Sequence, residues 1–523
     1  MLNLSMLLED SARRYPDRDA LIHDEQRFTY AQLNAVSNQV ANLLVSRGIR
    51  PGDKVALSLP NVPWFPALYY GILKAGAVVV PLNILLKGRE IAYHLADSQA
   101  KAHFCHESTP DLPIAEFARE GFADTPGCEH LFVISADQVA PGEGVTALPH
   151  ALENQSSEFE SAVREATDTA VILYTSGTTG QPKGAELSHS NMVMNAQTSN
   201  RLFDSRPSQQ DTHLTALPLF HTFGQTVNMN SAFSVAATLI LLPRFDAKSA
   251  LKIMNEQNVT VFAGVPTMYW GLLDALAAGV DGVDVTRIAA NLRKAISGGS
   301  ALPVEIHKQF RQRFGVQILE GYGLSETSPL AVFSDAESDT RPGSIGTPVW
   351  GVQVQLVDAQ WKPVTSPNEV GEIAIRGHNV MTGYYNRPAA TAEVMREGWF
   401  RSGDLARRDE DGFYYIVDRM KDLIIRGGYN VYPREIEEVL YEHPAVREVA
   451  VVGLPHAVHG EEVGAAVSLR SGASATTDEL REYVKARVAP YKYPRLIWIL
   501  DSLPTGGTGK ILKRAIELPT DIS

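Results

Sequence analysis

The chain has 523 residues, with 47 basic and 60 acidic side chains and a net charge of −13 at neutral pH. This length suffices for about three ordinary domains, and 44% hydrophobic with 20% charged residues is typical of a globular protein, not of a disordered or fibrous one. The negative charge argues against a protein that coats nucleic acid or an anionic membrane. The two cysteines, Cys105 and Cys128, are too few for a disulfide framework or a thiolate metal cluster, so we expect a reducing, cytoplasmic setting.

The sequence predicts no membrane-spanning helix. Its longest apolar stretches, such as Ala75 to Leu82, are far shorter than the roughly 20 residues that a bilayer requires. Acidic residues also arrive too early for a cleavable signal peptide. Peripheral contact with a membrane stays open, as does the oligomeric state.

Short β-branched runs alternate with amphipathic stretches over the first 340 residues. Strands are predicted at Lys54–Leu59, Val78–Pro81, Ala170–Tyr174, Thr238–Leu242, Thr260–Ala263 and Ala295–Ile296, and helices at Trp64–Ala75, Ser188–Gln197, Lys248–Glu256 and Val304–Phe314. Strands separated by helices are typical of parallel βαβ sheets with both faces covered. We therefore expect a mixed α/β protein, with room for two α/β subdomains in this region.

The pattern changes near Arg341. Strands predicted at Val352–Val357, Gly371–Arg376 and Gly412–Val417 indicate an antiparallel barrel or sheet, and they are followed by helices at Pro433–Glu442 and Thr477–Val488 and strands at Val446–Gly453 and Glu462–Leu469. The polar stretch Asp418–Asp422 lies between the two regions. We expect a large N-terminal domain over residues 1–420 and a small mobile α+β cap over residues 421–523.

The most informative segment is YTSGTTGQPKG, from Tyr174 to Gly184. It follows a predicted buried strand and is expected to precede a helix. Its glycines let backbone N–H groups face a ligand, its hydroxyls add donors, and Lys183 supplies a positive charge, as a polyphosphate requires. The segment is not a Walker A sequence, because Lys183 follows Pro182 and is not followed by Ser or Thr.

This segment resembles the signature of the adenylate-forming superfamily, which includes acyl- and aryl-CoA synthetases, nonribosomal peptide adenylation domains and firefly-type luciferases. The resemblance extends from about Leu7 to Leu512, because further family motifs follow in the expected order, and it is closest to the fatty-acyl-CoA ligases. It implies ATP, Mg²⁺ and CoA as ligands. The phosphate-binding candidates are Thr175, Ser176, Gly177, Thr178, Thr179, Gly180 and Lys183.

Four further segments are expected to complete the nucleotide site. In GYGLSET, an aromatic ring can stack on adenine, a hydroxyl can bind phosphate and the carboxylate of Glu326 can hold Mg²⁺. The segment SGGS ends a predicted strand, SGD precedes one, and Asp418-Arg419 follows one. The resemblance implies that Asp404 and Arg419 bind the ribose. The ATP/AMP-binding candidates from these segments are Gly298, Gly299, Ser300, Gly321, Tyr322, Gly323, Ser325, Asp404 and Arg419.

His221, in the segment PLFHTFG, is by residue type alone more often a packed structural residue than a catalytic one. The resemblance implies instead that it lies at the wall of the acyl pocket, near the entry of the thiol. Candidate pocket stretches contain no Lys or Arg, and Gly271 stands where malonate-using relatives carry arginine, which disfavours a dicarboxylate. The acyl-pocket candidates are His221, Phe223, Val265, Met268, Trp270 and Leu330.

The C-terminal region carries three further matches to the family. Lys421 lies at the hinge position, and the following stretch resembles the face that lines the CoA tunnel, with Gly427, Gly428 and Tyr429 as CoA-binding candidates. The segment PTGGTGKILKR resembles the C-terminal signature, so Lys510 is the leading catalytic candidate beside His221 and Glu326.

The resemblance implies an ATP-dependent acyl-CoA synthetase that makes an acyl-AMP with release of pyrophosphate and then transfers the acyl group to CoA. Rotation of the small domain about Lys421 would withdraw Lys510 between the two steps. The mostly apolar pocket stretches favour a medium- or long-chain fatty acid. An aryl or branched acid, a carrier-protein acceptor and, in another class, a luciferase-like oxygenase are the alternatives.

Overall fold

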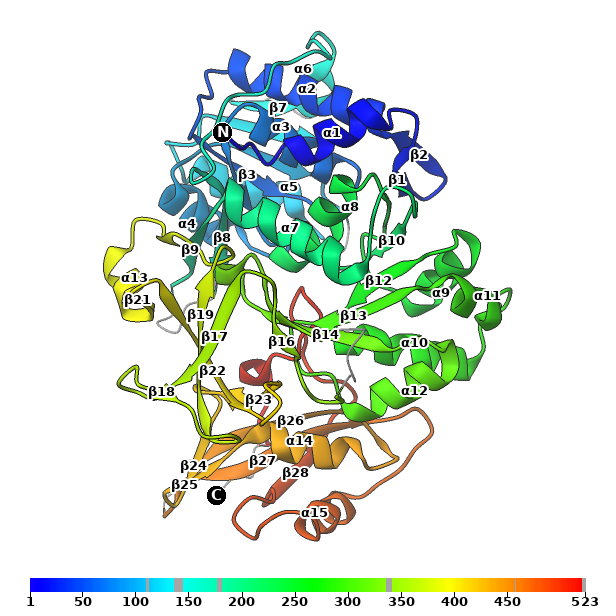
Figure 1. The fold of residues 1–523 in the computed structure, drawn as a ribbon, viewed down its shortest axis with the longest axis vertical. Coiled ribbons are helices and arrows are strands. Elements are labelled where there is room, and N and C mark those ends of the chain that lie inside the picture. The colour runs from blue at the N-terminus through cyan, green and yellow to red at the C-terminus, as the bar shows by residue number, and fades with distance from the viewer. Residues whose placement is uncertain (110–111, 136–143, 176–180, 335–340, 457, 520–523) are drawn as a thin grey trace.

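The structure is a computed structural model of the protein and describes residues 1–109, 112–135, 144–175, 181–334, 341–456 and 458–519. It confirms a mixed α/β fold with a large N-terminal domain and a small C-terminal domain (Figure 1). The small domain, orange to red, lies below the large one, and its red C-terminal segment returns upward into the centre of the molecule.

The first large sheet has eight strands within the described residues, in the order β20-β9-β8-β4-β3-β5-β6-β7. Its inner strands pair in parallel, which suits buried apolar runs such as Val78–Pro81. The strands are β3 Lys54–Ser58, β4 Val78–Pro81, β5 Ala100–His106, β6 His130–Ile134, β7 Val145–Ala147, β8 Thr169–Thr175, β9 Lys183–Ser188 and β20 Gly383–Tyr384. The helices packed near them are α2 Tyr30–Ser46, α3 Trp64–Lys74, α4 Gly88–Ser98, α5 Ile114–Ala123, α6 Leu148–Leu152 and α7 His189–Phe203.

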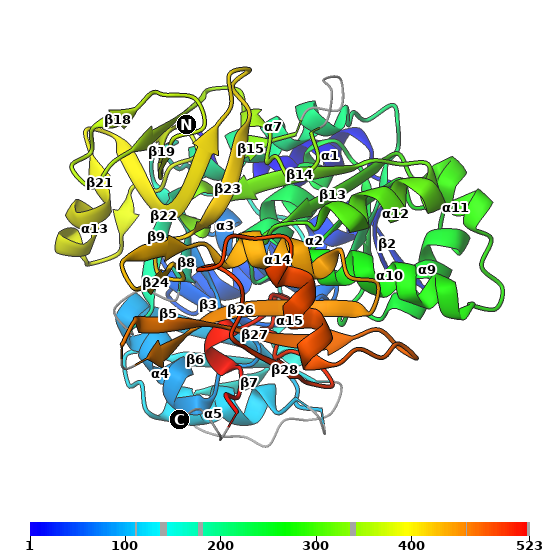
Figure 2. The same ribbon diagram turned by 90° about the horizontal axis from the view of Figure 1, so that it is seen from below.

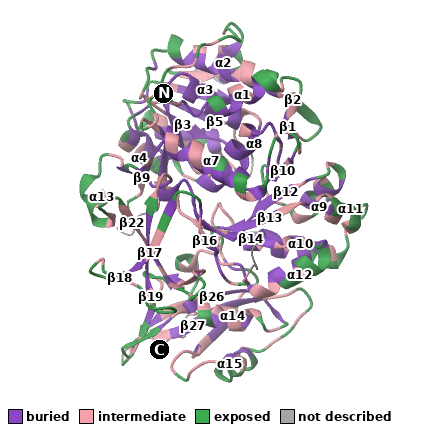
Figure 3. Ribbon diagram, in the orientation of Figure 1, coloured by how far each residue is buried: buried purple, intermediate pink, exposed green. Residues whose placement is uncertain are grey.

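The second large sheet has nine strands within the described residues, in the order β16-β15-β14-β13-β12-β10-β11-β1-β2. Its strands are β1 Asp19–His23, β2 Gln26–Thr29, β10 Thr212–Thr215, β11 Thr238–Leu241, β12 Val261–Gly264, β13 Lys294–Gly298, β14 Ile318–Gly323, β15 Leu330–Phe333 and β16 Thr347–Pro348. The associated helices are α1 Met6–Arg14, the π-helix η1 Phe223–Asn230, α8 Ser231–Ser234, α9 Ala247–Glu256, α10 Pro266–Ala278, α11 Val285–Asn291, α12 Val304–Phe314 and the 3₁₀ turn η2 Ser325–Thr327. One continuous apolar core joins both sheets, and Figure 3 shows the buried residues concentrated in and beside their strands.

An antiparallel sheet follows, in the order β18-β17-β19-β22-β21, with β23 paired to β22. It comprises β17 Val352–Val357, β18 Pro363–Val364, β19 Val370–Gly377, β21 Met395–Arg396, β22 Trp399–Arg408 and β23 Tyr414–Arg419, with α13 Pro388–Val394 beside it. Its register shifts where Glu372 of β19 pairs with Leu405 and the next pair is Ala374 with Arg401. This irregularity bends the segment that contains Gly403, whose φ is +77°.

The small domain has its own apolar core, centred on the β26–β27 pair and helices α14 and α15. Its elements are β24 Ile424–Arg426, β25 Tyr429–Val431, α14 Pro433–Tyr441, β26 Val446–His456, β27 Gly460–Leu469, α15 Thr477–Lys485, β28 Leu496–Ile499 and the 3₁₀ turn η3 Lys513–Ala515. Figure 2, seen from below, shows these elements spread across the underside of the large domain.

Most predicted elements are present, and three local predictions are wrong. The phosphate-loop segment leads into the strand β9, not directly into a helix, because Lys183–Ser188 pairs antiparallel with β8 before α7 begins. The segment Ser402–Asp404 lies inside β22 and does not precede a strand, while Asp418-Arg419 forms the end of β23.

Within the described ranges, every helix is either too short or too polar to span a membrane.

Candidate active site

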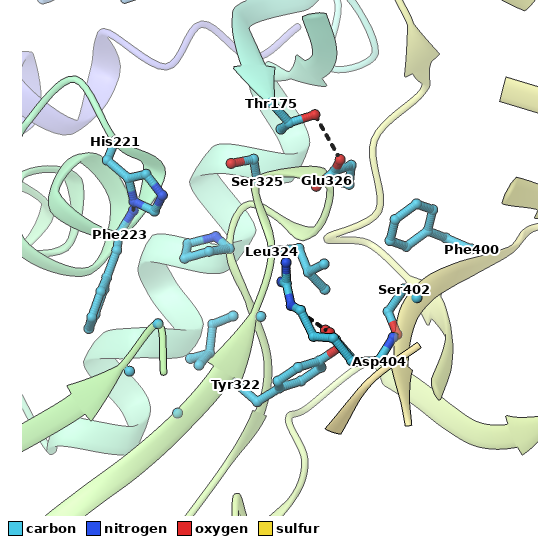
Figure 4. Close-up of a pocket in the computed structure, with 18 of the residues that line it drawn as sticks. Thr175, His221, Phe223, Tyr322, Leu324, Ser325, Glu326, Phe400, Ser402 and Asp404 are labelled. Carbon is cyan, nitrogen blue, oxygen red and sulfur yellow. Dashed lines mark hydrogen bonds and ion pairs between the residues drawn. The ribbon is translucent and has the colours of Figure 1, made fainter. Parts of the chain in front are cut away.

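A cavity of about 640 Å³ lies where the carboxyl ends of β8, β13 and β14 face the antiparallel sheet and the C-terminal tail. Figure 4 shows His221 and Phe223 on one side of it and Phe400, Ser402 and Asp404 on the other. The predicted site residues that line it are Thr175, Lys183, His221, Phe223, Gly298, Gly299, Gly321, Tyr322, Gly323, Ser325, Glu326, Leu330, Asp404, Arg419, Lys421 and Lys510. The predicted residues Ser176, Gly177, Thr178, Thr179 and Gly180 lie outside the described residues.

Lys510 reaches this cavity from the C-terminal tail. The hydroxyl of Thr267, on α10, donates to the carbonyl oxygen of Gly509 at 3.0 Å and anchors the tail next to the lysine. The Lys510 Cε lies 2.9 Å from the position that a β-carbon on Gly299 would occupy, so a side chain there would require the end of the lysine to shift, and the φ of +83° itself favours glycine. Burial, followed by the charge of Arg419, lowers the pKa of the Lys510 ammonium to about 8.

Asp404 projects from the bend in β22 and is only 4% exposed. Its Oδ2 accepts a hydrogen bond from the Tyr322 hydroxyl at 2.8 Å, and its Oδ1 lies 3.0 Å from Nε of Arg419. Burial raises the pKa of Tyr322 well above its usual value, so this hydroxyl remains a donor. The carboxylate is therefore fixed in orientation and keeps lone pairs for further donors, such as a pair of hydroxyls.

Glu326, on η2, lies at the opposite polar edge of the cavity. Its Oε1 accepts a hydrogen bond from Thr175 Oγ1 at 3.2 Å (Figure 4). The same Oε1 accepts a second hydrogen bond, from the Tyr384 hydroxyl at 3.0 Å. The Lys183 ammonium lies 5.4 Å from the centroid of the Tyr384 ring. This edge thus combines a carboxylate, two hydroxyls and a positive charge.

The Glu326 edge fits Mg²⁺ bound together with phosphate. Among the residues that the structure describes, no three His, Cys, Asp or Glu side chains gather as a metal cluster. Mg²⁺ is commonly held by one or two carboxylates together with substrate phosphates and water, and does not need a cage made by the protein alone. One carboxylate with an adjacent hydroxyl matches that mode of binding.

The other part of the cavity, which we call the apolar end, is hydrophobic. It is formed by Phe203, Phe223, Val227, Ile296, Leu330 and Phe333. Phe203, at the end of α7, and Phe333, at the end of β15, close it with ring centroids 5.8 Å apart. None of these six side chains carries a charge, so the apolar end suits the hydrocarbon part of a ligand.

His221 lies at the cavity wall, two residues before Phe223. Its Nδ1 accepts a hydrogen bond from the backbone N–H of Phe223 at 3.3 Å, which leaves Nε2 to carry the proton of the neutral ring. Burial, and secondarily the charge of Lys510, lowers the pKa of His221 to about 3. The ring is therefore neutral at physiological pH.

Several predicted residues do not line this cavity. Val265 and Met268 are buried at the start of α10, and Ser300 is exposed just beyond Gly299. Trp270 is buried on α10 beneath Arg470 of the small domain, whose Cζ lies 4.6 Å from the ring centroid. Trp270 does not line this cavity, and its expected place in the acyl pocket stays a prediction, as it does for Val265 and Met268.

The CoA-binding candidates lie elsewhere on the small domain, at the β24–β25 hairpin. Gly427 and Gly428 form its turn with φ values of +56° and +84°. Tyr429 is 61% exposed and packs its ring against Tyr491, with centroids 4.9 Å apart. In this structure the hairpin and Lys510 therefore occupy different parts of the small domain, and only Lys510 lines the cavity.

The sequence did not single out several residues that line the cavity. Tyr384 contacts both Lys183 and Glu326, and Phe203 lies beyond the predicted end of its helix. The Glu372 carboxylate pairs with Arg401 and accepts the Gly403 N–H at 2.9 Å. The acidic Glu372, directly before the apolar run Ile373–Ile375, was a signal for this last contact.

Comparison with known proteins gives a consistent picture. The sequence matches the AMP-binding enzyme family over residues 8–385 and the AMP-binding enzyme C-terminal domain over residues 435–510. It is 35% identical to a long-chain-fatty-acid–CoA ligase of Bacillus subtilis strain 168, covering 98% of this chain and 94% of that protein. It is 37% identical to a feruloyl-CoA synthase of Amycolatopsis sp, covering 97% and 96%.

The fold agrees with solved structures over nearly its whole length. The crystal structure of ATP-bound MatB from Rhodopseudomonas palustris superposes with a TM-score of 0.87 at 33% identity, covering 98% of both chains.

Proposed function

This chain belongs to the AMP-binding enzyme family, and from that premise we propose how its cavity activates a carboxylic acid and which acids it accepts. The chain is an AMP-forming acid–CoA ligase, with ATP and CoA as co-substrates. The observation that supports the proposed mechanism is the meeting of Lys510, Glu326 and Asp404 around one cavity with an uncharged apolar end.

In the first half-reaction, a carboxylate oxygen attacks the α-phosphorus of ATP, the bond to the bridging oxygen breaks, and pyrophosphate leaves. The Lys510 ammonium would contact the carboxylate and the α-phosphate, which lowers their mutual repulsion and stabilises the charge that develops on the phosphate. Asp404 and Arg419 would hold the ribose, and Tyr322 would lie against the adenine. Thr175 and Lys183 would bind the outer phosphates together with the loop between them.

Glu326 would hold Mg²⁺, with Thr175 next to it. When bound, this ion supplies positive charge that neutralises the phosphate oxygens during the transfer. The Tyr384 hydroxyl orients the Glu326 carboxylate, since it donates to the same Oε1 as Thr175.

In the second half-reaction, the thiol of CoA attacks the acyl carbon. A carbon–sulfur bond forms, the bond to the phosphate oxygen breaks, AMP leaves, and the thiol proton passes to water. Lys510 lines the cavity in the present arrangement, while Gly427, Gly428 and Tyr429 lie outside it. We place the boundary between the domains at residues 420 and 421, and rotation about Lys421 would exchange these two sets of groups.

The substrate we propose is an acid with an uncharged apolar body, in the first place a medium- or long-chain fatty acid. The support is the apolar end, where Val227, Ile296 and Leu330 offer aliphatic contacts. None of the six side chains that form it is a cation that could pair with a second carboxylate. The similarity to a long-chain-fatty-acid–CoA ligase points the same way.

An aryl acid is the second candidate, and a specific observation favours it. Three phenylalanine rings, those of Phe203, Phe223 and Phe333, surround the apolar end, and such rings pack well against a flat aromatic acid. The similarity to a feruloyl-CoA synthase supports this candidate. A branched acid and an acyl group destined for a carrier protein are the remaining alternatives.

The test is a screen for pyrophosphate release with a matched panel of saturated fatty acids of increasing length, aryl acids and dicarboxylates, each with and without CoA. The proposal predicts release with uncharged fatty or aryl acids, formation of the CoA thioester, and little release with dicarboxylates. Preference for a dicarboxylate would contradict the role of the apolar end.

A further inference from the structure

Helix α10 carries three residues that contact the small domain: Thr267, Trp270 and Asp274. Their spacing of three and then four residues places them along one face of the helix, one turn apart. This stripe, which we call the α10 dock, lies outside the cavity. In Figure 1 the small domain lies below the α10 and α12 helices.

The central contact of the α10 dock is between Trp270 and Arg470. Trp270 is only 5% exposed, and the Arg470 Cζ lies 4.6 Å from its ring centroid, within the range of a cation–π interaction. The Arg470 Nε donates a hydrogen bond to the carbonyl oxygen of Val446 at 3.0 Å. That bond fixes the guanidinium at the ends of β26 and β27, where it meets the helix.

The other two contacts lie one turn to either side. Thr267 donates to the carbonyl oxygen of Gly509, the residue that precedes Lys510. Asp274 lies 4.0 Å from Nε of Arg447, and since both side chains are nearly half exposed, this ion pair contributes little by itself. The pair of Trp270 and Arg470 is thus the strongest contact of the three. The hydrogen bond of Thr267 to Gly509 links the same helix to the residue next to Lys510.

We propose that the α10 dock holds the small domain in the orientation that inserts Lys510 into the cavity, with Trp270 and Arg470 as positioning residues for acid activation. The proposal rests on the proposed function of Lys510. The two residues touch neither substrate nor the reacting atoms, because neither lines the cavity. The dock must open when the small domain rotates, so its contacts favour the first half-reaction and are absent during the second.

The test compares Arg470→Gln with wild type in two separate assays on the full-length enzyme. One follows formation of acyl-AMP from acid and ATP without CoA, and the other follows thiolysis of supplied acyl-AMP by CoA. A desolvated cation–π contact predicts a loss of about 5- to 30-fold in the first assay. Thiolysis should be unchanged or faster in Arg470→Gln, because the small domain separates from α10 more easily when the contact with Trp270 is lost. Arg470→Lys should restore part of the first rate, since the charge is retained.

Arg487→Ala is the matched control. Arg487 lies just beyond the end of helix α15, and its guanidinium Cζ is 3.6 Å from the centroid of the Tyr483 ring on that helix, so this variant loses a comparable contact that does not reach α10. Both half-reactions should stay close to wild type in this control. Equal losses of acyl-AMP formation in Arg470→Gln and Arg487→Ala would overturn the proposal.

A second measurement does not depend on activity. Amide hydrogen exchange in the nucleotide-free enzyme should become faster at residues 505–512 in Arg470→Gln, because the tail is held less often against α10. Unchanged exchange in this segment would overturn the proposal, whereas failure of wild type to form acyl-AMP from any acid would instead overturn the proposed function.

Discussion

Lys510 and Gly299 lie in contact, with the lysine Cε 2.9 Å from the position that a β-carbon on the glycine would occupy. Gly299 follows β13 in the large domain, and Lys510 belongs to the tail of the small domain. A β-carbon at residue 299 would therefore require the end of the lysine side chain to move from its present position. This contact links the orientation of the small domain to the chemistry of the site.

Gly299→Ala tests this contact. The new methyl group should displace Lys510, and we expect acyl-AMP formation to fall by about 10²-fold or more, as when one charge-stabilising group is removed from an active site. Gly279→Ala is the control, because Gly279 has the same φ of +83° with nothing within 4 Å. Both glycines have a φ of +83°, which strains any other residue, so a comparable loss of activity in the two variants would refute the steric account.

The lowered pKa of Lys510 predicts a pH dependence for the first half-reaction. The lysine is a cation below its pKa of about 8 and a neutral amine above it, so kcat/KM for acyl-AMP formation should decline as the pH rises through about 8. The phosphates of bound ATP favour the ammonium, so the decline in kcat should lie at higher pH. Lys510→Arg keeps its charge throughout and should lose this limb of the profile at a lower overall rate. A limb that persists in Lys510→Arg would mean that another group titrates.

Phe203 is predicted to limit the length of the acid, since it closes the apolar end against Phe333. Phe203→Leu should raise kcat/KM for longer or bulkier acids several-fold relative to shorter ones. Phe104→Leu is the matched control, because Phe104 is equally buried in the core around the first large sheet and does not line the cavity. Identical selectivity profiles in the two variants, measured over a chain-length series, would show that Phe203 does not set this limit.

The hinge role of Lys421 predicts different effects on the two half-reactions. Lys421→Pro restricts the backbone at the proposed pivot and should slow thiolysis of acyl-AMP far more than its formation. Lys421→Ala removes the side chain but leaves the backbone free, and it should keep thiolysis within a few-fold of wild type. If proline slows both half-reactions equally, rotation about this residue is not part of the cycle.

The same logic applies to Lys510→Ala. Formation of acyl-AMP should fall by about 10²- to 10³-fold, while thiolysis of supplied acyl-AMP continues, because the lysine acts only in the first step. The measurement is the rate of each half-reaction in a separate assay, after circular dichroism has shown that the variant is folded. A variant that is folded yet equally inactive in both steps would contradict the assigned role.

Local sequence patterns predicted many elements closely, and the differences arise where tertiary contacts decide. The boundaries of Val304–Phe314 and Val352–Val357 were predicted correctly, because their periodicity ends at clear turn signals. The strand β9 was missed because Lys183–Ser188 becomes a strand only through pairing with β8. The bend at Gly403 depends on the Glu372 carboxylate from a neighbouring strand, which no local pattern reveals.

The candidate site likewise combines residues that sequence motifs identify with residues that only tertiary packing brings into place. Motifs identified Lys510, Glu326, Asp404 and Tyr322, and the structure brings all four to one cavity. Trp270 does not line this cavity, because an apolar, aromatic segment does not indicate which side of α10 faces it. Phe203 was not considered, since it lies far from any motif and reaches the apolar end only through the packing of α7.

The most direct test of the central claim uses an acid labelled with ¹⁸O in both carboxylate oxygens, with ATP, Mg²⁺ and CoA. Direct attack of the carboxylate on the α-phosphorus predicts one ¹⁸O in the released AMP and one in the thioester, both read by mass spectrometry. Label in the pyrophosphate or in inorganic phosphate, with none in AMP, would contradict the account.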